Sequence, residues 1–579
     1  VNIIYFGYFQ DINFWGLIMT TVQELTEIVG NNHIITSAAK SLRYRKGYRS
    51  GRGDALAVVL PGNLMELWQV LKVLHAHNII IIMQASNTSL TEGSIPAPGY
   101  DRECVVVNGT RIKGVQLINK GQEALAFPGT TLFKLENALK AINREPHSVI
   151  GSSNLGASVI GGINNNSGGA LIQRGPAYTE LSLFAQIDAN DELHLVNHLG
   201  IDLGNTPEEM INNLENRNFD IDHVKQDGKR VGHNRDYEAR VRNIGSHTPT
   251  RYNADPNELY EVSGSSGKLA AFAVRLDTFP KEGASQVFYI GTNDPGVLEN
   301  LRRHILSEFK NLPVSGEYMH KEAYDLAKKY GKDSLLVIDT IGTNMLPYLF
   351  GMKSTAERIL AHIPTFKPYF PDRVLQHLGQ VFPNQLPKRI EEYNEKYEHY
   401  LQLKMVGEGI DEARQYLKEF FKTASGDYLE CTPSEADRAA THRYVTAGVA
   451  IRYQEVFQNK KLDILPLDIA LPRNEFDWFE HLPKEIEDKI EHKLYYGHFL
   501  DHVMHQDYIL KPGVDPHELK LEMLKLLDKR GAIYPAEHNV GHLYHAASTL
   551  VSHYKRNDPT NSFNPGIGLT TMEKYWGNY

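Results

Sequence analysis

The sequence predicts an α+β protein of several domains, on three observations. The chain has 579 residues, which suggests two to four domains rather than one core. Residues 22–277 alternate short β-type runs with helical segments, whereas helical patterns dominate residues 281–527. Residues 534–568 return to turn chemistry that is rich in Gly and Asn.

The clearest local unit is a β-α-β arrangement near the N-terminus. Residues 55–60 form a β-type run that stops at a Pro-Gly pair. Residues 63–77 repeat apolar side chains at three- and four-residue steps, which predicts an amphipathic helix with Asn63 as its N-cap. Residues 79–83 are a second β-type run, so the three segments predict one β-α-β unit.

Composition argues against several classes of protein. A net charge of -9 and a pI near 6.3 give no reason to expect a nucleic-acid partner. Two cysteines, Cys104 and Cys431, exclude a disulfide framework and a cysteine-based metal centre, and they favour a reducing compartment. We expect no spanning helix. Residues 1–18 carry Asp11 and precede Met19, which we expect to be the natural first residue of the protein. The alternative is that residues 1–18 form an apolar arm that lies on a surface.

Two basic regions stand out. Residues 217–251 are polar and hold eight Lys or Arg against five acids, which predicts a mobile basic insertion. Residues 353–389 hold six Lys or Arg against two acids, interleaved with Phe and Tyr. That mixture suits an anionic membrane surface, although composition alone also fits a solvated helical region.

Two loops rich in glycine and hydroxyl groups follow β-type segments, at residues 84–94 and 151–169. A pyrophosphate needs backbone N–H donors, small side chains and hydroxyls, and both loops supply them. Tight turns are the alternative. The chain has no Gly-x-Gly-x-x-Gly after a strand and no Gly-Lys-Ser/Thr loop, which disfavours an NAD enzyme or an ATPase.

A histidine-rich stretch, residues 496–508, is followed by Glu537-His538. A neutral imidazole is well matched to removing a hydroxyl proton at neutral pH. The alternative for each lone histidine is a hydrogen-bonded structural residue, and we favour that alternative for His502.

The two loops resemble the FAD-binding domain of the vanillyl-alcohol oxidase superfamily. Four longer strings are similar to the bacterial respiratory, quinone-dependent D-lactate dehydrogenases, and they occupy residues 44–51, 144–153, 251–256 and 534–542. The resemblance covers the whole chain. It implies a two-part FAD-binding domain of vanillyl-alcohol oxidase type, an α/β cap domain and a helical membrane-facing insertion.

The resemblance also implies domain limits. The FAD-binding domain is expected at residues 19–277 with 529–579. The substrate-binding cap is expected at 278–320, 397–434 and 459–528, and the membrane-associating domain at 321–396 with 435–458.

Non-covalent FAD is the cofactor that the resemblance implies, and the first loop has no histidine that could link a flavin. The residues that match the family's FAD contacts are Ala85, Ser86, Asn87, Thr88, Ser89, Gly93, Ser94, Gly151, Ser158, Gly168 and Ala271.

Related 2-hydroxyacid dehydrogenases carry Gly-His-x6-His and then Glu-His, matched here by His498, His505, Glu537 and His538. The resemblance implies that His538 or His505 removes the hydroxyl proton. It implies that Arg443 clamps the substrate carboxylate, unless Arg443 is a surface helix arginine. In some relatives the two histidines and the glutamate bind a divalent metal. Here residues 500–503 depart from their Gly-Asp-Gly-Asn interior, which puts the metal at His498, His505 and Glu537 in doubt.

The implied reaction is oxidation of D-lactate to pyruvate, with electrons passed to a membrane quinone. The implied place is the cytoplasmic face of the bacterial inner membrane, as a peripheral protein on an anionic surface. The alternative is a dehydrogenase of another D-2-hydroxy acid, 2-hydroxyglutarate or glycolate, that uses a soluble acceptor. A flavin-free binding protein on the same fold is a third reading.

Overall fold

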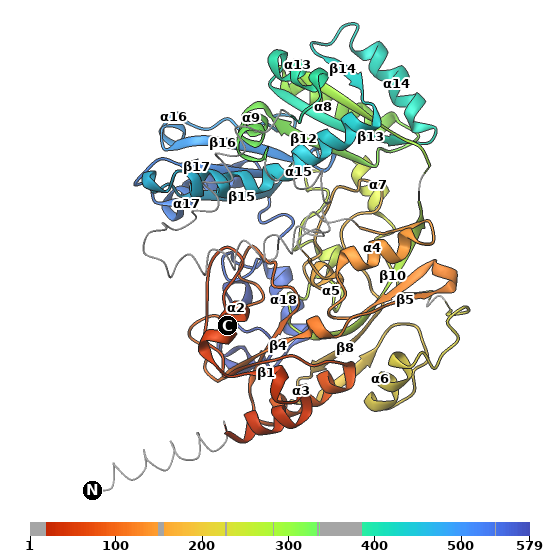
Figure 1. Cartoon of the computed structure of the whole chain (residues 1–579), viewed down its shortest axis with the longest axis vertical. Coiled ribbons are helices and arrows are strands. Elements are labelled where there is room, and N and C mark those ends of the chain that lie inside the picture. Colours follow the sequence, from red (N-terminus) through yellow and green to blue (C-terminus); the bar gives the residue numbers. More distant parts are fainter. Residues whose placement is uncertain are drawn as a thin grey trace.

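The computed structural model describes residues 19–148, 156–225, 228–281, 283–332, 335, 385–538 and 540–579. The described chain is organised by three β-sheets (Figure 1). Three regions that the sequence singled out lie outside the described residues: 1–18, the start of the second loop with Gly151, and most of the basic aromatic segment at 353–389.

The first sheet contains the predicted β-α-β unit. Its strands run in the order β1-β2-β4-β3, with β2 and β3 both parallel to β4. The crossover helix begins after Asn63, whose side chain accepts a hydrogen bond from the Glu66 backbone N–H, so the predicted N-cap is confirmed. The bounds are β1 (Ile34–Ile35), α2 (Ala38–Arg45), β2 (Ala57–Val59), α3 (Leu64–Ala76), β3 (Ile80–Gln84) and β4 (Cys104–Asn108).

The second sheet is centred on its longest strand, β10, which pairs antiparallel with β6, β7 and β8. Trp68 of α3 packs edge-on against Phe272 of β10, with ring centroids 6.5 Å apart, so the first two sheets share one core. The bounds are β5 (Val115–Ile118), β6 (Glu123–Ala126), α4 (Leu132–Lys140), β7 (Arg144–Pro146), α5 (Val159–Asn164), β8 (Ser182–Ile187), β9 (Leu193–Asn197), α6 (Pro207–Glu215) and β10 (Ala270–Pro280).

The C-terminal segment returns to these two sheets. In Figure 1, α18 (Ser548–Asn557) and the C-terminus lie among elements of the first half of the chain. The Ile81 backbone donates to the Ser562 carbonyl at 2.9 Å and accepts from the Asn564 N–H at 3.0 Å. The part of the protein that contains the first two sheets is therefore built from two chain segments that are far apart in sequence.

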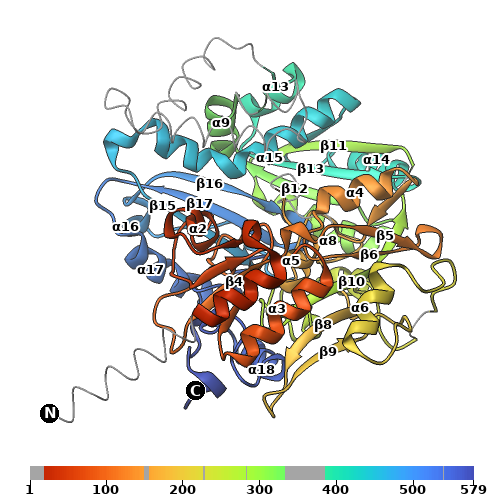
Figure 2. The same cartoon turned by 60° about the horizontal axis from the view of Figure 1, so that its bottom comes forward.

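The third sheet has seven strands in the order β14-β11-β13-β12-β16-β17-β15. Helices α9, α13 and α15 cover one face, and α8, α14 and α17 pack on the other (Figure 2). Helical patterns dominate this region of the sequence, and the sheet between the two helical layers agrees with the α/β cap domain that the resemblance implied. The bounds are β11 (Ser285–Thr292), α8 (Pro295–Glu308), β12 (Ser315–His320), α9 (Lys321–Tyr330), α13 (Lys388–Lys396), β13 (His399–Val406), α14 (Gly409–Phe420), β14 (Asp427–Glu430), α15 (Pro433–Val456), β15 (Ile464–Ala470), α16 (Lys484–Glu487), β16 (Ile490–His498), β17 (Val503–Leu510) and α17 (Pro516–Lys529).

All seven strands lie in ranges that the sequence analysis assigned to the cap. Among the described residues, no helix is both long and apolar enough to cross a membrane.

Residues 217–251 differ in part from the mobile insertion expected there. They include α7 (Tyr237–Arg242), in which Tyr237 and Val241 are fully buried. Arg251 at the end of the range is 2% exposed. Sparse apolar residues suggested a segment without a core, but these three side chains are built into the protein interior.

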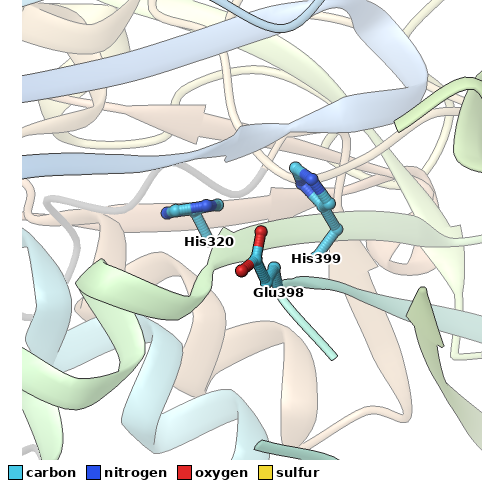
Figure 3. Close-up of side chains that lie close together, drawn as sticks. All are labelled: His320, Glu398 and His399. Carbon is cyan, nitrogen blue, oxygen red and sulfur yellow. The ribbon is translucent and has the colours of Figure 1, made fainter. Parts of the chain in front are cut away.

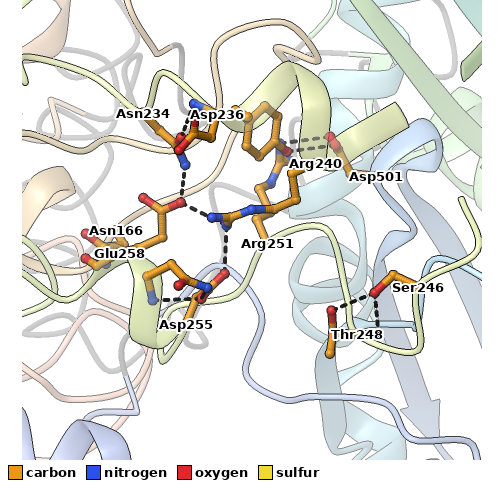
Figure 4. Close-up of polar contacts among 12 residues, drawn as sticks. Asn166, Asn234, Asp236, Arg240, Ser246, Thr248, Arg251, Asp255, Glu258 and Asp501 are labelled. Carbon is orange, nitrogen blue, oxygen red and sulfur yellow. Dashed lines mark hydrogen bonds and ion pairs between the residues drawn. The ribbon is translucent and has the colours of Figure 1, made fainter. Parts of the chain in front are cut away.

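A buried polar cluster next to α7 leads to a pH-dependent prediction. Arg240 forms ion pairs with Asp255 at 2.7 Å and with Glu258 at 2.9 Å, and Asn234 also donates to Glu258 (Figure 4). Burial, only partly offset by Arg240, raises the pKa of Glu258 from its ordinary 4.5 to about 7. The folded state therefore binds more protons than the unfolded state between these pH values, and the stability contribution of Glu258 falls as pH rises through them.

Glu258→Gln removes this titration. Relative to the wild type, we expect the stability of the variant to rise by about 3 kcal/mol between pH 4.5 and pH 8, on top of a pH-independent difference between the neutral Glu and Gln side chains. Thermal unfolding midpoints measured across this pH range should show the gain as a few degrees. A wild-type-to-variant difference that stays flat with pH would contradict the assignment.

Candidate active site

Strand register brings the predicted histidines together. Strands β16 and β17 form a hairpin through a short 3₁₀ turn, and Tyr496 lies opposite His505. His498 at the end of β16 lies opposite Glu317 of β12, and His505 lies opposite Asp468 of β15. Because side chains of directly opposed residues share one face, each histidine receives a carboxylate neighbour.

The segment after α17 adds Glu537 and His538. Ala470 exchanges backbone hydrogen bonds with Ile533, and Asp468 accepts from the backbone N–H of Glu537 at 2.7 Å and of His538 at 3.3 Å. Residues 533–538 therefore run beside β15 and deliver Glu537 to the two histidines.

The three predicted metal-ligand residues form a compact set. Their ligand atoms all lie within 4.8 Å of one another. His498 Nε2 is 3.4 Å and His505 Nε2 is 3.8 Å from Glu537 Oε2. The Nδ1 atoms face carboxylates on the outer side, with His498 2.7 Å from Glu317 and His505 3.2 Å from Asp468. This carboxylate–histidine arrangement is typical of metal-binding imidazoles, so the residues fit a divalent ion.

Without an ion, protons balance the charges in this cluster. Burial opposes a charge on His498, but Glu317 and Glu537 outweigh it and raise the pKa of His498 to about 10. Burial would raise the pKa of Glu537, but His498 and Arg251 hold it well below its ordinary value. A bound divalent ion would take the place of the His498 proton.

Arg251 fixes the far side of Glu537. Its guanidinium lies 2.7 Å from Glu537 Oε1 and 2.8 Å from Asp501 Oδ2, and it also donates to Tyr237 and the Gly169 carbonyl. Asp501 is fully buried and Glu537 is 8% exposed. The guanidinium therefore compensates two carboxylates that have little access to water.

The second glycine loop touches this cluster. A Cβ on Gly168 would collide with the Glu537 carboxylate and the Arg251 guanidinium, so only glycine fits there. The candidate pyrophosphate loop and the histidine cluster are thus parts of one site.

Arg443 lies inside the protein, so the surface alternative is wrong. It projects from α15, is 8% exposed, and pairs with Glu317 at 3.0 Å. Its guanidinium also lies 4.6 Å from the centroid of the Tyr496 ring. Glu317 thereby joins Arg443 to His498 and places the arginine in the same cluster.

His538 and His502 differ in their surroundings. The side chain of His538 is 36% exposed, and its Nε2 lies 3.8 Å from Asp468. His502 is fully buried and bonded to Glu299 at 3.0 Å, which matches the structural role favoured for it.

The two candidate flavin loops meet through the C-terminal segment. Asn564 donates to the Gly93 carbonyl of the first loop at 2.9 Å and to the Ser266 carbonyl at 3.0 Å, and Ser266 in turn bonds Asn164 of the second loop. Residues 85–90 keep partial exposure, which leaves their groups accessible to a ligand.

Within the loops, local bonds hold the predicted residues in place. Asn108 donates to the Ala85 carbonyl, Asn87 accepts from Ser94, and Ser89 accepts from the Gly93 N–H. Ser158 caps α5 through the Gly161 N–H at 3.0 Å. Ala271 lies in β10 beside a β-bulge. Ser86 and Thr88 are half-buried.

Gly541 gives a prediction about the first flavin loop. Its φ is +56°, and a Cβ there would collide with the Thr91 carbonyl oxygen of the first loop. We expect Gly541→Ala to push this loop aside, destabilise the protein by about 2 kcal/mol or more, and reduce the FAD retained on purification. Gly407→Ala is the matched control, because Gly407 has a φ of +53° with nothing within 4 Å. Equal FAD content and equal unfolding midpoints in the two variants would contradict this.

The sequence did not predict the residues that bond to the predicted site residues and hold them in place. Glu317, Asp501 and Tyr237 received no role, and Arg251 appeared only inside a longer string. Their roles depend on strand register and on chain segments that are hundreds of residues apart, for which the sequence holds no local signal.

The fold and a family model together define the class of protein. The structure matches solved p-cresol methylhydroxylase with a TM-score of 0.55 and 12% identity, covering 96% of this chain and 98% of that chain. It matches alkyldihydroxyacetonephosphate synthase with a TM-score of 0.57 and 12% identity, covering 94% and 84%. A family model described as an FAD binding domain matches residues 55–181. The chain is an FAD-dependent protein with the vanillyl-alcohol oxidase fold.

More similar relatives identify the family. A quinone-dependent D-lactate dehydrogenase of Escherichia coli is 56% identical over 96% of this chain and 97% of the relative. Those of Haemophilus influenzae and Corynebacterium glutamicum are 54% and 44% identical, over 96% of this chain and 99% and 97% of the relatives. A family model described as "D-lactate dehydrogenase, membrane binding" matches residues 287–576. The chain belongs to the quinone-dependent D-lactate dehydrogenase family.

Proposed function

We propose that the protein oxidises D-lactate to pyruvate on FAD and passes the electrons to a membrane quinone. The observation that carries this proposal is the contact between the second flavin loop, at Gly168, and the cluster of His498, His505 and Glu537. A hydroxy acid bound there lies between a hydride acceptor and groups that take up a proton.

Arg443 is proposed to bind the substrate carboxylate. Its charge is shared with Glu317, but its Nε is buried and makes no hydrogen bond with a described residue. An unsatisfied buried N–H is costly, and a carboxylate would satisfy it.

His538 is proposed to remove the hydroxyl proton. Asp468 lies beside one ring nitrogen and can orient the imidazole, as a carboxylate commonly does for a histidine base. His505 lies between Asp468 and Glu537, so both of its ring nitrogens face carboxylates. The more open His538 is therefore better placed to meet the substrate.

Bound FAD supplies the hydride acceptor at the substrate carbon and the carrier from which a quinone takes electrons. If an ion is present, His498, His505 and Glu537 would hold it, and it would polarise the substrate hydroxyl. Arg251 keeps Glu537 ionised and in position in either case.

The protein carries a membrane-binding domain, as the family model indicates. We propose that it lies peripherally on the cytoplasmic face of the bacterial inner membrane and prefers anionic lipid. The composition of residues 353–389 supports the lipid preference. Sedimentation with vesicles tests this: binding to phosphatidylglycerol vesicles should exceed binding to phosphatidylcholine vesicles and weaken with salt. Equal binding to both would contradict the preference.

Steady-state assays test the reaction and the acceptor. A short-chain ubiquinone should be reduced with D-lactate and not with L-lactate, and pyruvate should accumulate at the same rate. Faster turnover with D-2-hydroxyglutarate or glycolate, or with a soluble acceptor in place of quinone, would favour the alternative dehydrogenase instead.

A further inference from the structure

We propose that His320, Glu398 and His399 form a second metal site, in the cap, for a divalent transition-metal ion such as Zn²⁺. The proposal is independent of the lactate reaction. Two imidazoles and one carboxylate are a donor set that suits Zn²⁺.

Strand pairing builds the site. His320 is the last residue of β12 and lies directly opposite His399, the first residue of β13, with ring centroids 5.3 Å apart. Glu398 precedes β13, and Figure 3 shows its carboxylate between the two rings. One ligand atom from each residue lies within 4.8 Å of the others. A modest side-chain adjustment brings such a set to metal-ligand distances.

His399 has the support that metal-binding histidines usually have. Its Nδ1 lies 2.8 Å from the Tyr318 hydroxyl, which fixes the ring and leaves the other nitrogen for an ion. His399 is 3% exposed, so the surrounding protein holds its ring in this orientation.

His320 is also free to act as a metal ligand. Its ring accepts one long hydrogen bond, 3.4 Å, from the Glu322 backbone N–H, which a metal–ligand bond can replace. His320 and Glu398 line a cavity of about 460 Å³ that also includes Lys321, Lys329 and His492. Three protein ligands would leave a fourth coordination position for water or a small anion.

The site is separate from the lactate cluster. Glu317, the nearest member of that cluster along β12, lies three residues from His320, about 10 Å along the strand. A further grouping of Asp188, Glu192 and His194 has no buried member, whereas His399 of the cap grouping is buried, and His194 already pairs with Asp188. That grouping provides a matched control.

The test is equilibrium dialysis of the FAD-loaded protein against micromolar free Zn²⁺, with bound metal measured by mass spectrometry. Glu398→Gln and His320→Asn should each weaken one bound Zn²⁺ at least tenfold. Asn is chosen at position 320 because it can still cap α9. The control Glu192→Gln should bind as the wild type does. Thermal unfolding confirms that the variants remain folded.

Loss of one ion in both cap variants, and not in the control, supports the site. An ion on the lactate cluster is common to all these proteins and cancels in the comparison. Zn²⁺ binding unchanged in Glu398→Gln, or no Zn²⁺ bound by the wild type, would overturn the proposal.

Discussion

His538→Asn should lower the rate constant for flavin reduction by D-lactate about a thousandfold, which is within the usual contribution of a general base. The amide occupies similar space but takes up no proton. FAD content and the unfolding midpoint should change little, because the His538 side chain is 36% exposed. Anaerobic stopped-flow absorbance of the flavin measures this rate without the quinone step.

His481→Asn is the matched control, since His481 is a cap histidine whose side chain is 66% exposed and lies outside the cluster. It should reduce its flavin at the wild-type rate. A rate for His538→Asn within threefold of the wild type would remove His538 as the base and leave His505.

Arg251→Met should destabilise the protein by about 3 to 5 kcal/mol, because it leaves Glu537 and Asp501 buried without their cation. The variant should also lose activity, since Glu537 loses the partner that orients it. Thermal unfolding and the yield of folded protein measure the first effect.

Arg414→Met provides the comparison at the surface. Arg414 pairs with Glu430 at 2.8 Å, but its side chain is 41% exposed. Such a pair contributes about 0 to 1 kcal/mol. If the two methionine variants unfolded at the same temperature, the Arg251 network would not be a main support of the site.

Local patterns predicted local structure. Apolar spacing located α3, and the Asn63 cap agreed with it, because both are determined by residues within a few positions. The resemblance to the Gly-His-x6-His pattern of related dehydrogenases placed His498 and His505 in one group. The hairpin explains why, because the two side chains come from adjacent strands that are joined by one turn.

The sequence did not predict which distant strands pair with one another. The seven-stranded sheet joins β11 to β13 and β12 to β16, so its order depends on contacts between distant segments. For the same reason Glu317 was missed. The core position of Tyr237 was also missed, because one buried helix turn in a polar stretch gives almost no periodic signal.

The central claim is that D-lactate reduces the bound flavin and that a quinone reoxidises it. Anaerobic addition of D-lactate to the purified protein, followed by absorbance near the flavin maximum, tests it most directly. We expect rapid bleaching with D-lactate, none with L-lactate or D-2-hydroxyglutarate, and recovery of the spectrum when a short-chain quinone is added. A flavin that D-lactate leaves oxidised while another hydroxy acid bleaches it would contradict the account.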